Sequence, residues 1–437
     1  MSDYSGVLAE LVAGTWREPG TGKQYDIGIK DIAIRDSLDG AEADLVSNVH
    51  AGQSLTIVSD EYTHSAIGER IYKALKASGF TVDEYVWKNP SCSEEGVEHI
   101  RDVTRNCDAR IAVGSGTVSD TVKYASFLDN KTYSVFATSP MNAYTTATAS
   151  VSYGGFKRSI TCKGAQGIYF DLSVLAKCPP HLISSAFADV ICRTTCQVDW
   201  LLSHLLFNTP YEQTPYTLLA YDEPDMIANA HRSLNGDIEA LGMLTRIAAI
   251  MGMGTRFTAT THSGSMAEHM ISHYIDMFAG DKHPRTSHGQ QVGVATITMS
   301  QLHTQVLNND RPPVLKPTQL PEQWIRDSFD SEMANTMLEQ SQAKALDASQ
   351  CDALNTRLSD DWEPIRKQLL ECMVPYNTLH SSMQAAGCHL TASDLELDPD
   401  FYREAVQGAR FIRDRYSMLD MIDDSEGLSG FIKTMPV

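Results

Sequence analysis

A change in hydrophobic periodicity partway along the chain constrains its fold more than any other feature. Before about residue 177, short apolar runs alternate with amphipathic segments, which is typical of β-α units that feed a parallel sheet. We therefore predict an α/β domain over 1–177 and an all-α domain over 178–437, divided near Pro179 and Pro180. The helical periodicity of the second part runs through 182–206, 222–253, 266–279, 288–308 and most of 322–423.

The elements of the first domain can be assigned from their patterns. Residues 156–171 are expected to form a hairpin or two short strands, and the proline-rich 308–321 to form a surface loop. The remaining pattern predicts strands at 55–60, 80–87, 110–115 and 133–138, separated by helices at 64–79, about 94–106 and about 117–128.

Charge and composition narrow the classes of partner. The chain has 55 acidic and only 35 basic residues, which gives a net charge of -20. Neither nucleic acid nor an anionic membrane is therefore expected to bind. The N-terminus lacks the features of a signal peptide and no apolar run is long enough to span a bilayer, so we expect a cytoplasmic protein without membrane insertion. The cysteines include no C-x-x-C pair, and Cys192 and Cys196 are expected to be small buried residues on one helix face.

A turn of small residues follows the predicted strand at 110–115. Gly114, Ser115, Gly116 and Thr117 would let backbone N–H groups approach a pyrophosphate at the positive end of the next helix. The full G-x-G-x-x-G spacing is missing, and turns of this kind also occur in α/β proteins for structural reasons alone. Asp60, at the end of strand 55–60, has two interpretations: it accepts from a ribose hydroxyl, or it caps the next helix.

A possible metal site lies in the helical part. His269 and His288 fall on consecutive predicted helices, and a helical hairpin would bring their imidazoles together. Asp189 occupies an otherwise apolar turn, where a carboxylate is costly unless it meets a cation. One aspartate and two histidines suit zinc, nickel or iron(II), with a position left for water or substrate. His273, one turn after His269, could supply a further ligand, but a role in supporting the site or in contacting the substrate is favoured.

Seven longer motifs occur in order along the chain: GSGTVSDTVKYAS (114–126), FATSPMNAYTTATASV (136–151), GFKRSI (155–160), FADVICRTTCQVDWLLSH (187–204), EHMISHYIDMF (268–278), HGQQVGVATITM (288–299) and ARFIRDRYSMLD (409–420). With these motifs the chain resembles the glycerol-1-phosphate dehydrogenases, which are relatives of glycerol dehydrogenase, iron-containing alcohol dehydrogenases and dehydroquinate synthase. The resemblance implies a dehydroquinate-synthase-like fold, NAD or NADP as cofactor, and a divalent metal on Asp189, His269 and His288. It also implies the reversible reduction of dihydroxyacetone phosphate to sn-glycerol 1-phosphate.

The resemblance further implies roles for single residues. Asn142 would orient the substrate, with Lys123 and His273 as the other catalytic candidates. Lys157 and Lys163 are further candidates for contact with phosphate groups. The cofactor-binding candidates are Asp60, Gly114, Ser115, Gly116, Thr117, Asp120, Thr138, Ser139 and Thr145.

This chain departs from the family pattern near the expected pocket. Ala143 stands where relatives have glycine, 263–265 reads Ser-Gly-Ser instead of Pro-Ala-Ser, and Phe187 and Ala188 precede Asp189 where a glycine is common. The substrate therefore stays open between a polyol phosphate, an unphosphorylated polyol and another ketone. A cyclase that uses bound NAD and a non-catalytic regulator are the alternatives. The expected partners are a small-molecule substrate and further copies of this chain in a homodimer or larger homo-oligomer.

Overall fold

The computed structural model describes residues 2–153 and 156–437, which form two compact units. The first contains Met1–Val190 and Glu212–Thr260, and the second contains Ile191–Tyr211 and Thr261–Val437. This division differs from the predicted boundary after residue 177. Contacts between segments far apart in the sequence determine this division: α13 (Ile238–Thr258) contacts strand β1 (Asp31–Arg35) of the first unit, and the short helices α10, α11 and α12, within 214–234, pack against α13.

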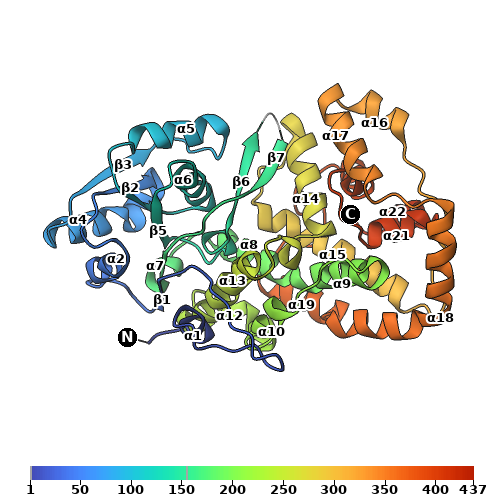
Figure 1. Ribbon diagram of the computed structural model, residues 1–437, viewed down its shortest axis with the longest axis horizontal. Coiled ribbons are helices and arrows are strands. Elements are labelled where there is room, and N and C mark those ends of the chain that lie inside the picture. The colour runs from blue at the N-terminus through green and yellow to red at the C-terminus, as the bar shows by residue number, and fades with distance from the viewer. Residues whose placement is uncertain (1, 154–155) are drawn as a thin grey trace. The chain divides into compact units, whose positions relative to one another are not determined.

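A six-stranded parallel sheet forms the centre of the first unit (Figure 1). In spatial order its strands are β1 (Asp31–Arg35), β8 (Gly167–Asp171), β5 (Thr132–Ala137), β4 (Ala109–Val113), β2 (Leu55–Asp60) and β3 (Val82–Trp87). β3 lies on one side of β2 and β4 on the other, so the chain reverses its direction across the sheet between β2 and β4. Ser59 pairs with Val113, and the two strands therefore end side by side.

Helices cover both faces of this sheet. α2 (Glu42–His50) packs with α4 (Glu69–Ala77), and α5 (Glu94–Val103) packs with α6 (Gly116–Leu128). The connection from β2 to β3 runs opposite to the one from β3 to β4, and right-handed crossovers then place α4 and α5 on opposite faces (Figure 1). Ile71 and Leu75 of α4 are fully buried against the sheet, where each contributes about 1.5–3 kcal/mol.

The predicted strands and helices of this α/β region are confirmed. Of the two alternatives for 156–171, the structure shows two short strands and not a hairpin: β7 (Phe156–Thr161) pairs antiparallel with β6 (Thr148–Tyr153), while β8 enters the main sheet between β1 and β5. The sheet that each strand joins depends on its pairing partner, and local periodicity does not reveal that partner. Gly155, within the GFKRSI motif, lies outside the described residues.

One long helix closes the first unit. α13 (Ile238–Thr258) contacts β1 and is apolar enough to cross a membrane, but 72% of its apolar window is buried in the protein, as in the core helix of a globular domain. The other elements of this unit are α1 (Val7–Val12), α3 (Glu61–Thr63), η1 (His64–Gly68), η2 (Asn142–Tyr144), α7 (Leu172–Leu175), most of α8 (Pro180–Ile191), α10 (Thr214–Leu219), α11 (Glu223–Ala228) and α12 (Ala230–Leu234).

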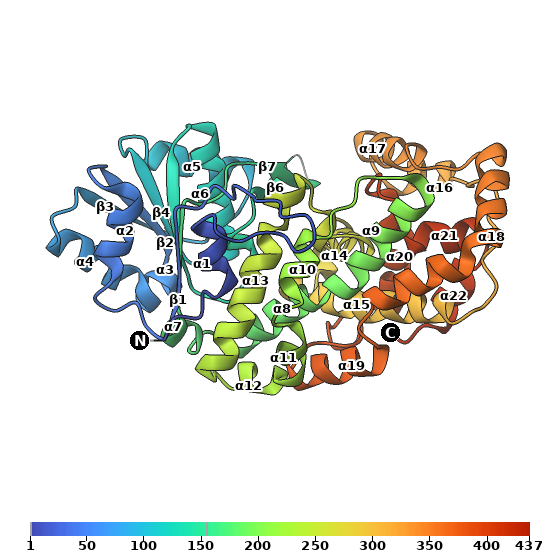
Figure 2. The same cartoon turned by 60° about the horizontal axis from the view of Figure 1, so that its bottom comes forward.

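The second unit is helical throughout its described residues, as predicted (Figure 2). The helix expected over 182–206 is interrupted at Cys192, which separates α8 from α9 (Arg193–Phe207). α14 (Ala267–Phe278) and α15 (His288–Leu307) form the predicted hairpin. The other elements are η3 (His262–Gly264), η4 (Gly280–Lys282), α16 (Glu322–Ser328), α17 (Ser331–Gln342), α18 (Ala348–Cys372), α19 (Tyr376–Ala385), α20 (Pro399–Gly408), η5 (Ala409–Phe411), α21 (Met418–Asp424) and α22 (Leu428–Thr434).

Candidate active site

The first part of the site lies where β2 and β4 end. Asp60 accepts a hydrogen bond from the Thr63 backbone N–H at 2.8 Å and so caps α3. Thr63 Oγ1 in turn donates to the Val113 carbonyl oxygen at 2.9 Å, which fastens the two strand ends together. Gly114 follows with φ at +128°, and a Cβ there would lie 2.5 Å from Thr63 Cγ2. Only glycine fits this turn without displacing Thr63.

The segment after Gly114 is open to a ligand. Ser115, Gly116 and Thr117 are partly exposed at the N-terminus of α6, at the carboxyl edge of the sheet. Sheets of this type bind nucleotides at the point where the chain reverses direction, and backbone N–H groups of the helix start face the phosphates. Asp60 is therefore a helix cap in the structure, and its contact with a ribose stays a prediction. Its second oxygen, Oδ2, accepts from Ser115 Oγ at 3.4 Å.

Substitution of the two glycines separates folding from cofactor binding. We expect Gly114→Ala to destabilise the protein by about 1–3 kcal/mol, because φ at +128° and the Thr63 side chain both oppose a Cβ. Gly116→Ala is the matched control, since its Cβ would meet nothing closer than the Ala143 methyl at 3.9 Å. Gly116→Ala should weaken binding of the dinucleotide and leave the stability of the protein unchanged. Urea unfolding and titration with NADH and NADPH measure both effects, and equal stability of the two variants would contradict the expectation.

Two of the residues expected at the cofactor or substrate are internal. Lys123 is fully buried, and its Nζ donates to Asp120 Oδ1 at 2.7 Å, to Thr146 Oγ1 at 2.8 Å and to the carbonyls of Ala143 and Thr148. Asp120 Oδ2 accepts from the Ser150 backbone N–H at 2.9 Å. Together they hold the segment after β5 against α6. Their geometry favours a supporting role over direct contact with a phosphate.

The loop after β5 is held from inside the unit. Ser139 Oγ lies 2.9 Å from the Tyr144 hydroxyl, whose pKa burial raises to about 12, so the phenol stays protonated. Thr145 is fully buried and donates from Oγ1 to the Ala249 carbonyl of α13 at 2.8 Å. A Cβ on Gly252 would lie 2.1 Å from the Asn142 carbonyl oxygen. Ser139 and Thr145 therefore shape the loop, whereas Thr138 is partly exposed.

Asn142 reaches the first of the three predicted metal ligands. Its Nδ2 donates to Asp189 Oδ2 at 2.8 Å, and both residues are partly exposed in the first unit. The amide holds the carboxylate of α8 in one orientation. This contact makes Asn142 a positioning residue for Asp189, in addition to its predicted contact with the substrate.

In the second unit, the hairpin of α14 and α15 brings three imidazoles together. The ring centroids of His269 and His288 lie 5.2 Å apart, and those of His269 and His273 lie 6.2 Å apart. His273 stacks on His288 with centroids 5.5 Å apart and ring planes 23° apart. Consecutive helices therefore place the two predicted histidine ligands side by side.

Hydrogen bonds at Nδ1 determine which nitrogen of His269 is basic. Glu268 Oε1 lies 2.9 Å from His269 Nδ1 and also accepts from the Met266 N–H and from Cys196 Sγ. Burial by itself would raise the pKa of Glu268, but these bonds, led by that from His269, lower it to about 2. The ionised carboxylate can only accept, so the proton lies on Nδ1 and Nε2 is the basic nitrogen.

The same reasoning separates His288 from His273. Ser272 Oγ donates to Gln291 Oε1 at 2.9 Å, so at 3.0 Å it accepts from His288 Nδ1, and His288 Nε2 is basic. Arg413 Nη2 can only donate, and it lies 3.1 Å from His273 Nδ1. His273 therefore carries its proton on Nε2. Two imidazoles present a basic nitrogen suited to a metal, and the third presents a hydrogen-bond donor.

Glu268 and two cysteines are the supporting residues that sequence reasoning missed. Cys192 and Cys196 are buried with their sulfur atoms 3.8 Å apart, and Cys196 Sγ lies 3.0 Å from Glu268 Oε1. With His269 they form a group whose ligand atoms lie within 4.8 Å of one another. Burial raises the pKa of the Cys196 thiol well above its usual value, so this thiol is a neutral donor to Glu268. In the sequence, Glu268 directly precedes His269, and the two cysteines are recognisable only because they lie four residues apart shortly after Asp189.

Sequence comparison connects this geometry with known proteins. The family model of the iron-containing alcohol dehydrogenases matches residues 33–179. A protein of Halalkalibacterium halodurans, named as an NAD(P)+ glycerol-1-phosphate dehydrogenase, is 26% identical over 57% of this chain and 64% of its own length. A protein of the same name from Bacillus subtilis is 26% identical over 66% of this chain and 75% of its own length. The match thus spans just under two thirds of the first relative and three quarters of the second.

Solved structures share the fold. Glycerol dehydrogenase from Schizosaccharomyces pombe aligns with a TM-score of 0.59 at 14% identity, covering 90% of this chain and 88% of the other. An NADH-dependent butanol dehydrogenase from Thermotoga maritima aligns with a TM-score of 0.60 at 13% identity, covering 92% of this chain and 96% of the other. At such low identity these likenesses concern the architecture alone.

Proposed function

We propose that this chain, a member of the group of iron-containing alcohol dehydrogenases and glycerol-1-phosphate dehydrogenases, interconverts dihydroxyacetone phosphate and sn-glycerol 1-phosphate with NAD or NADP. The observation that carries the proposal is that three neighbouring histidines differ in which ring nitrogen carries the proton. His269 and His288 present basic Nε2 atoms, whereas His273 presents an N–H. A divalent metal polarises a ketone oxygen, and an N–H beside the metal can donate a hydrogen bond to the substrate.

Asp189, His269 and His288 are the proposed metal ligands. One carboxylate and two neutral imidazoles are a set that could hold a divalent cation. The buried Glu268 makes His269 a stronger ligand, and the amide of Asn142 orients the Asp189 carboxylate. Zinc, nickel and iron(II) all accept this set, and zinc is the first choice for a site of this composition.

A divalent metal on these ligands would supply positive charge that polarises the ketone carbonyl for reduction by the nicotinamide cofactor. The residues of the chain bind and orient the reactants. The turn at Gly114, Ser115, Gly116 and Thr117 holds the pyrophosphate, and Asp60 accepts from the ribose. His273 donates from Nε2 to an oxygen of the substrate, and Asn142 orients the triose.

The proposed partners follow from the proposed reaction and from the net charge of the chain. The proposed substrate is a small polyol phosphate or its ketone, and the protein acts in the cytoplasm. We further propose a homodimer or larger homo-oligomer. Neither nucleic acid nor a membrane is proposed as a partner, because the net charge of -20 repels both.

The test is a turnover assay with the full chain, stripped of metal and then reloaded with zinc, nickel or iron(II). We expect dihydroxyacetone phosphate to be reduced with loss of NADH or NADPH absorbance, and only after a metal is restored. No turnover with any metal and either cofactor would reject the proposal. Nicotinamide that is reduced and reoxidised within one cycle, without net turnover, would instead indicate the cyclase alternative.

A further inference from the structure

Two arginines of the second unit are not neutralised by a carboxylate. Arg413 donates from Nη2 to His273 Nδ1 at 3.1 Å. Arg415 donates to the Ser265 carbonyl oxygen and, at 2.6 Å, to Thr261 Oγ1. All these acceptors are uncharged, and within residues 2–153 and 156–437 neither guanidinium forms an ion pair. Two cations in this state are unusual in a chain with a net charge of -20.

Arg413 and Arg415 are surrounded by other protein groups, although both side chains are partly exposed to solvent. Burial and the neighbouring charge of Arg413 lower the pKa of Arg415 to about 9, and burial lowers that of Arg413. Burial and the same two arginines lower the pKa of His262 to about 3, so this ring is neutral. Asp414 and Glu268 attract Arg415 only from beyond ion-pair distance. The two arginines thus place positive charge near the neutral ring of His262 and near each other.

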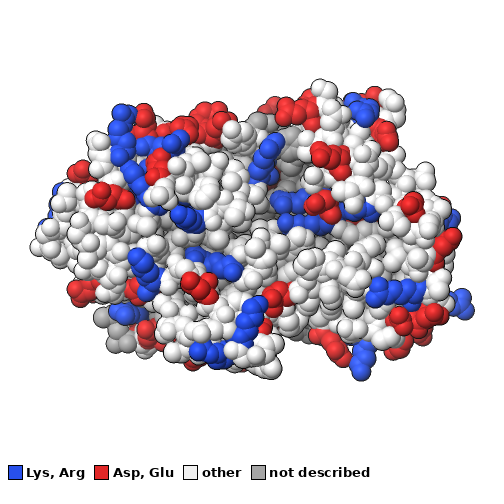
Figure 3. Space-filling model, viewed as in Figure 1, with Lys and Arg blue, Asp and Glu red and all other residues white. Residues whose placement is uncertain are grey.

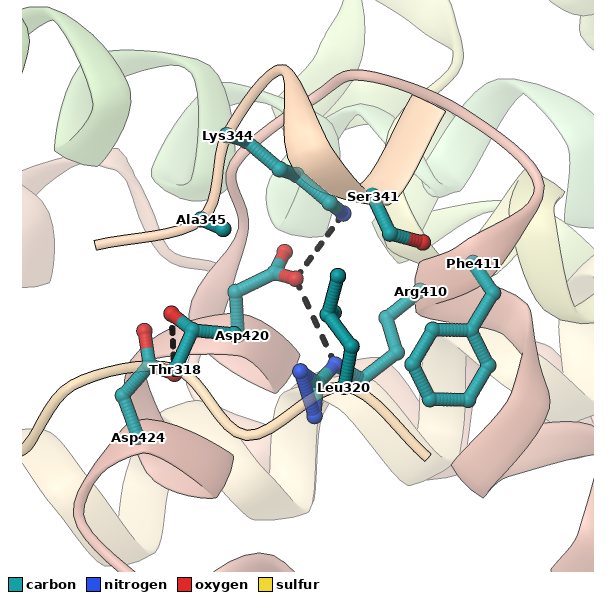
Figure 4. A pocket seen from close by; sticks show the side chains of 9 residues that line it. All are labelled: Thr318, Leu320, Ser341, Lys344, Ala345, Arg410, Phe411, Asp420 and Asp424. Atoms are coloured by element: carbon teal, nitrogen blue, oxygen red, sulfur yellow. Dashed lines mark hydrogen bonds and ion pairs between the residues drawn. The ribbon is translucent and has the colours of Figure 1, made fainter. Parts of the chain in front are cut away.

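Arg410, in the same segment, shows the contrasting arrangement. It is 2% exposed, its Nε lies 3.5 Å from Asp420 Oδ1, and its Nη1 bonds to Asp423. Lys344 Nζ reaches Asp420 Oδ1 at 2.8 Å, as the close view shows (Figure 4). The Met418 N–H donates to the buried Asp199 at 3.0 Å. These contacts attach the segment 409–420 to the rest of the unit on both sides of Arg413 and Arg415.

We propose that Arg413 and Arg415 form the subsite that binds the phosphate dianion of the substrate, with Arg413 in direct contact. Only one N–H of Arg413 is engaged, and a guanidinium fork matches two phosphate oxygens. Arg415 adds charge and acts as a positioning residue, because it holds the segment 261–265 that precedes α14. The inference deepens the proposed function, on which the identity of the ligand rests.

The position of Arg413 fits a phosphorylated ketone. It contacts His273, whose ring stacks on the proposed ligand His288. In dihydroxyacetone phosphate one carbon and one ester oxygen separate the carbonyl carbon from the phosphorus, so a phosphate on Arg413 leaves the ketone near these imidazoles. Basic side chains gather on the viewed face in the region where Figure 1 draws α14 (Figure 3). The arginines therefore replace Lys123 as the best candidates for the phosphate contact.

Two of the lysines predicted for this role are engaged elsewhere. Lys123 makes its bonds inside the first unit, and Lys163 Nζ bonds to Asn130 Oδ1 at 3.0 Å. The arginines lie in the ARFIRDRYSMLD segment, which sequence reasoning used only as evidence of resemblance.

The experiment compares Arg413→Gln, Arg413→Lys and Arg415→Gln in the full chain loaded with zinc and NAD. Arg403→Gln is the control, because among the described residues that partly exposed arginine of α20 forms an ion pair with Asp400 alone, at 2.8 Å. Inorganic phosphate is titrated calorimetrically into each protein, with the dinucleotide site already filled. Reduction of dihydroxyacetone phosphate and of dihydroxyacetone is then measured with NADH and NADPH.

For Arg413→Gln we expect phosphate affinity to fall about tenfold or more, and kcat/KM for the phosphorylated ketone to fall about a hundredfold. kcat/KM for dihydroxyacetone should stay within about twofold, and Arg413→Lys should be intermediate because it keeps the charge and loses the fork. Equal losses with both ketones, or phosphate binding that is absent from the parent or unchanged in Arg413→Gln, would overturn the subsite. If the parent reduces neither ketone, the proposed function fails, and the phosphate titration still decides the subsite.

Discussion

Replacing His269 or His288 by alanine is expected to abolish turnover, with a loss of about a thousandfold or more, while the protein keeps its fold. Each imidazole presents a basic Nε2 whose orientation is set by a bond at Nδ1, from Glu268 or Ser272. Without one of them the cation would lose a ligand and its charge beside the ketone. Metal content, circular dichroism and the turnover assay measure the three parts of this expectation.

A matched substitution keeps that result interpretable. His380→Ala removes a partly exposed histidine on α19 that contacts Tyr376 and none of the three clustered imidazoles. It should leave metal content and turnover unchanged. Full activity in either ligand variant would refute the assignment of that histidine.

The second large effect is expected for Glu268→Gln, which preserves shape and removes charge. We expect metal affinity to fall about ten- to a hundredfold, the usual cost of losing a carboxylate that supports a histidine ligand. The two carboxylate oxygens of Glu268 now accept from the Met266 N–H, the Thr195 hydroxyl and the Cys196 thiol. In the glutamine variant, the amide NH2 would replace one of these oxygens and could not accept from the donors that face it. Competition with a chelator measures the affinity, and Glu339→Gln on α17 is the exposed control. Unchanged metal affinity would exclude the supporting role.

The stability of the metal-free protein provides an independent readout. The pKa of Glu268 is lowered to about 2 from an ordinary value of 4.5, so its charge stabilises the fold above pH 4.5. That contribution is lost progressively as the pH falls from 4.5 towards 2. The difference in Tm between the parent and Glu268→Gln should therefore be full at pH 6 to 7 and shrink below pH 4.5. A difference that does not change with pH would indicate that shape, and not charge, is responsible.

Local patterns along the chain were sufficient for much of the architecture. The alternation of apolar runs and amphipathic helices up to residue 177 predicted the parallel sheet, because a strand buried on both faces has no polar positions to spare. The spacing of His269 and His288 predicted that a helical hairpin would join them, since a short loop forces consecutive helices to pack side by side. Resemblance to a family then supplied the chemistry.

Only the tertiary structure decided which side chains meet, because contacts between residues far apart in the sequence leave no local pattern. It placed β8 between β1 and β5 in the sheet and buried Lys123 among carbonyl and carboxylate oxygens. It also assigned Asp420 to Arg410 while leaving Arg413 and Arg415 without a carboxylate. Arg410 is thus neutralised in an ion pair, whereas Arg413 and Arg415 in the same short segment are not neutralised by any described residue. The charge of a buried group is stabilised by its neighbours in space and not by its neighbours in the chain.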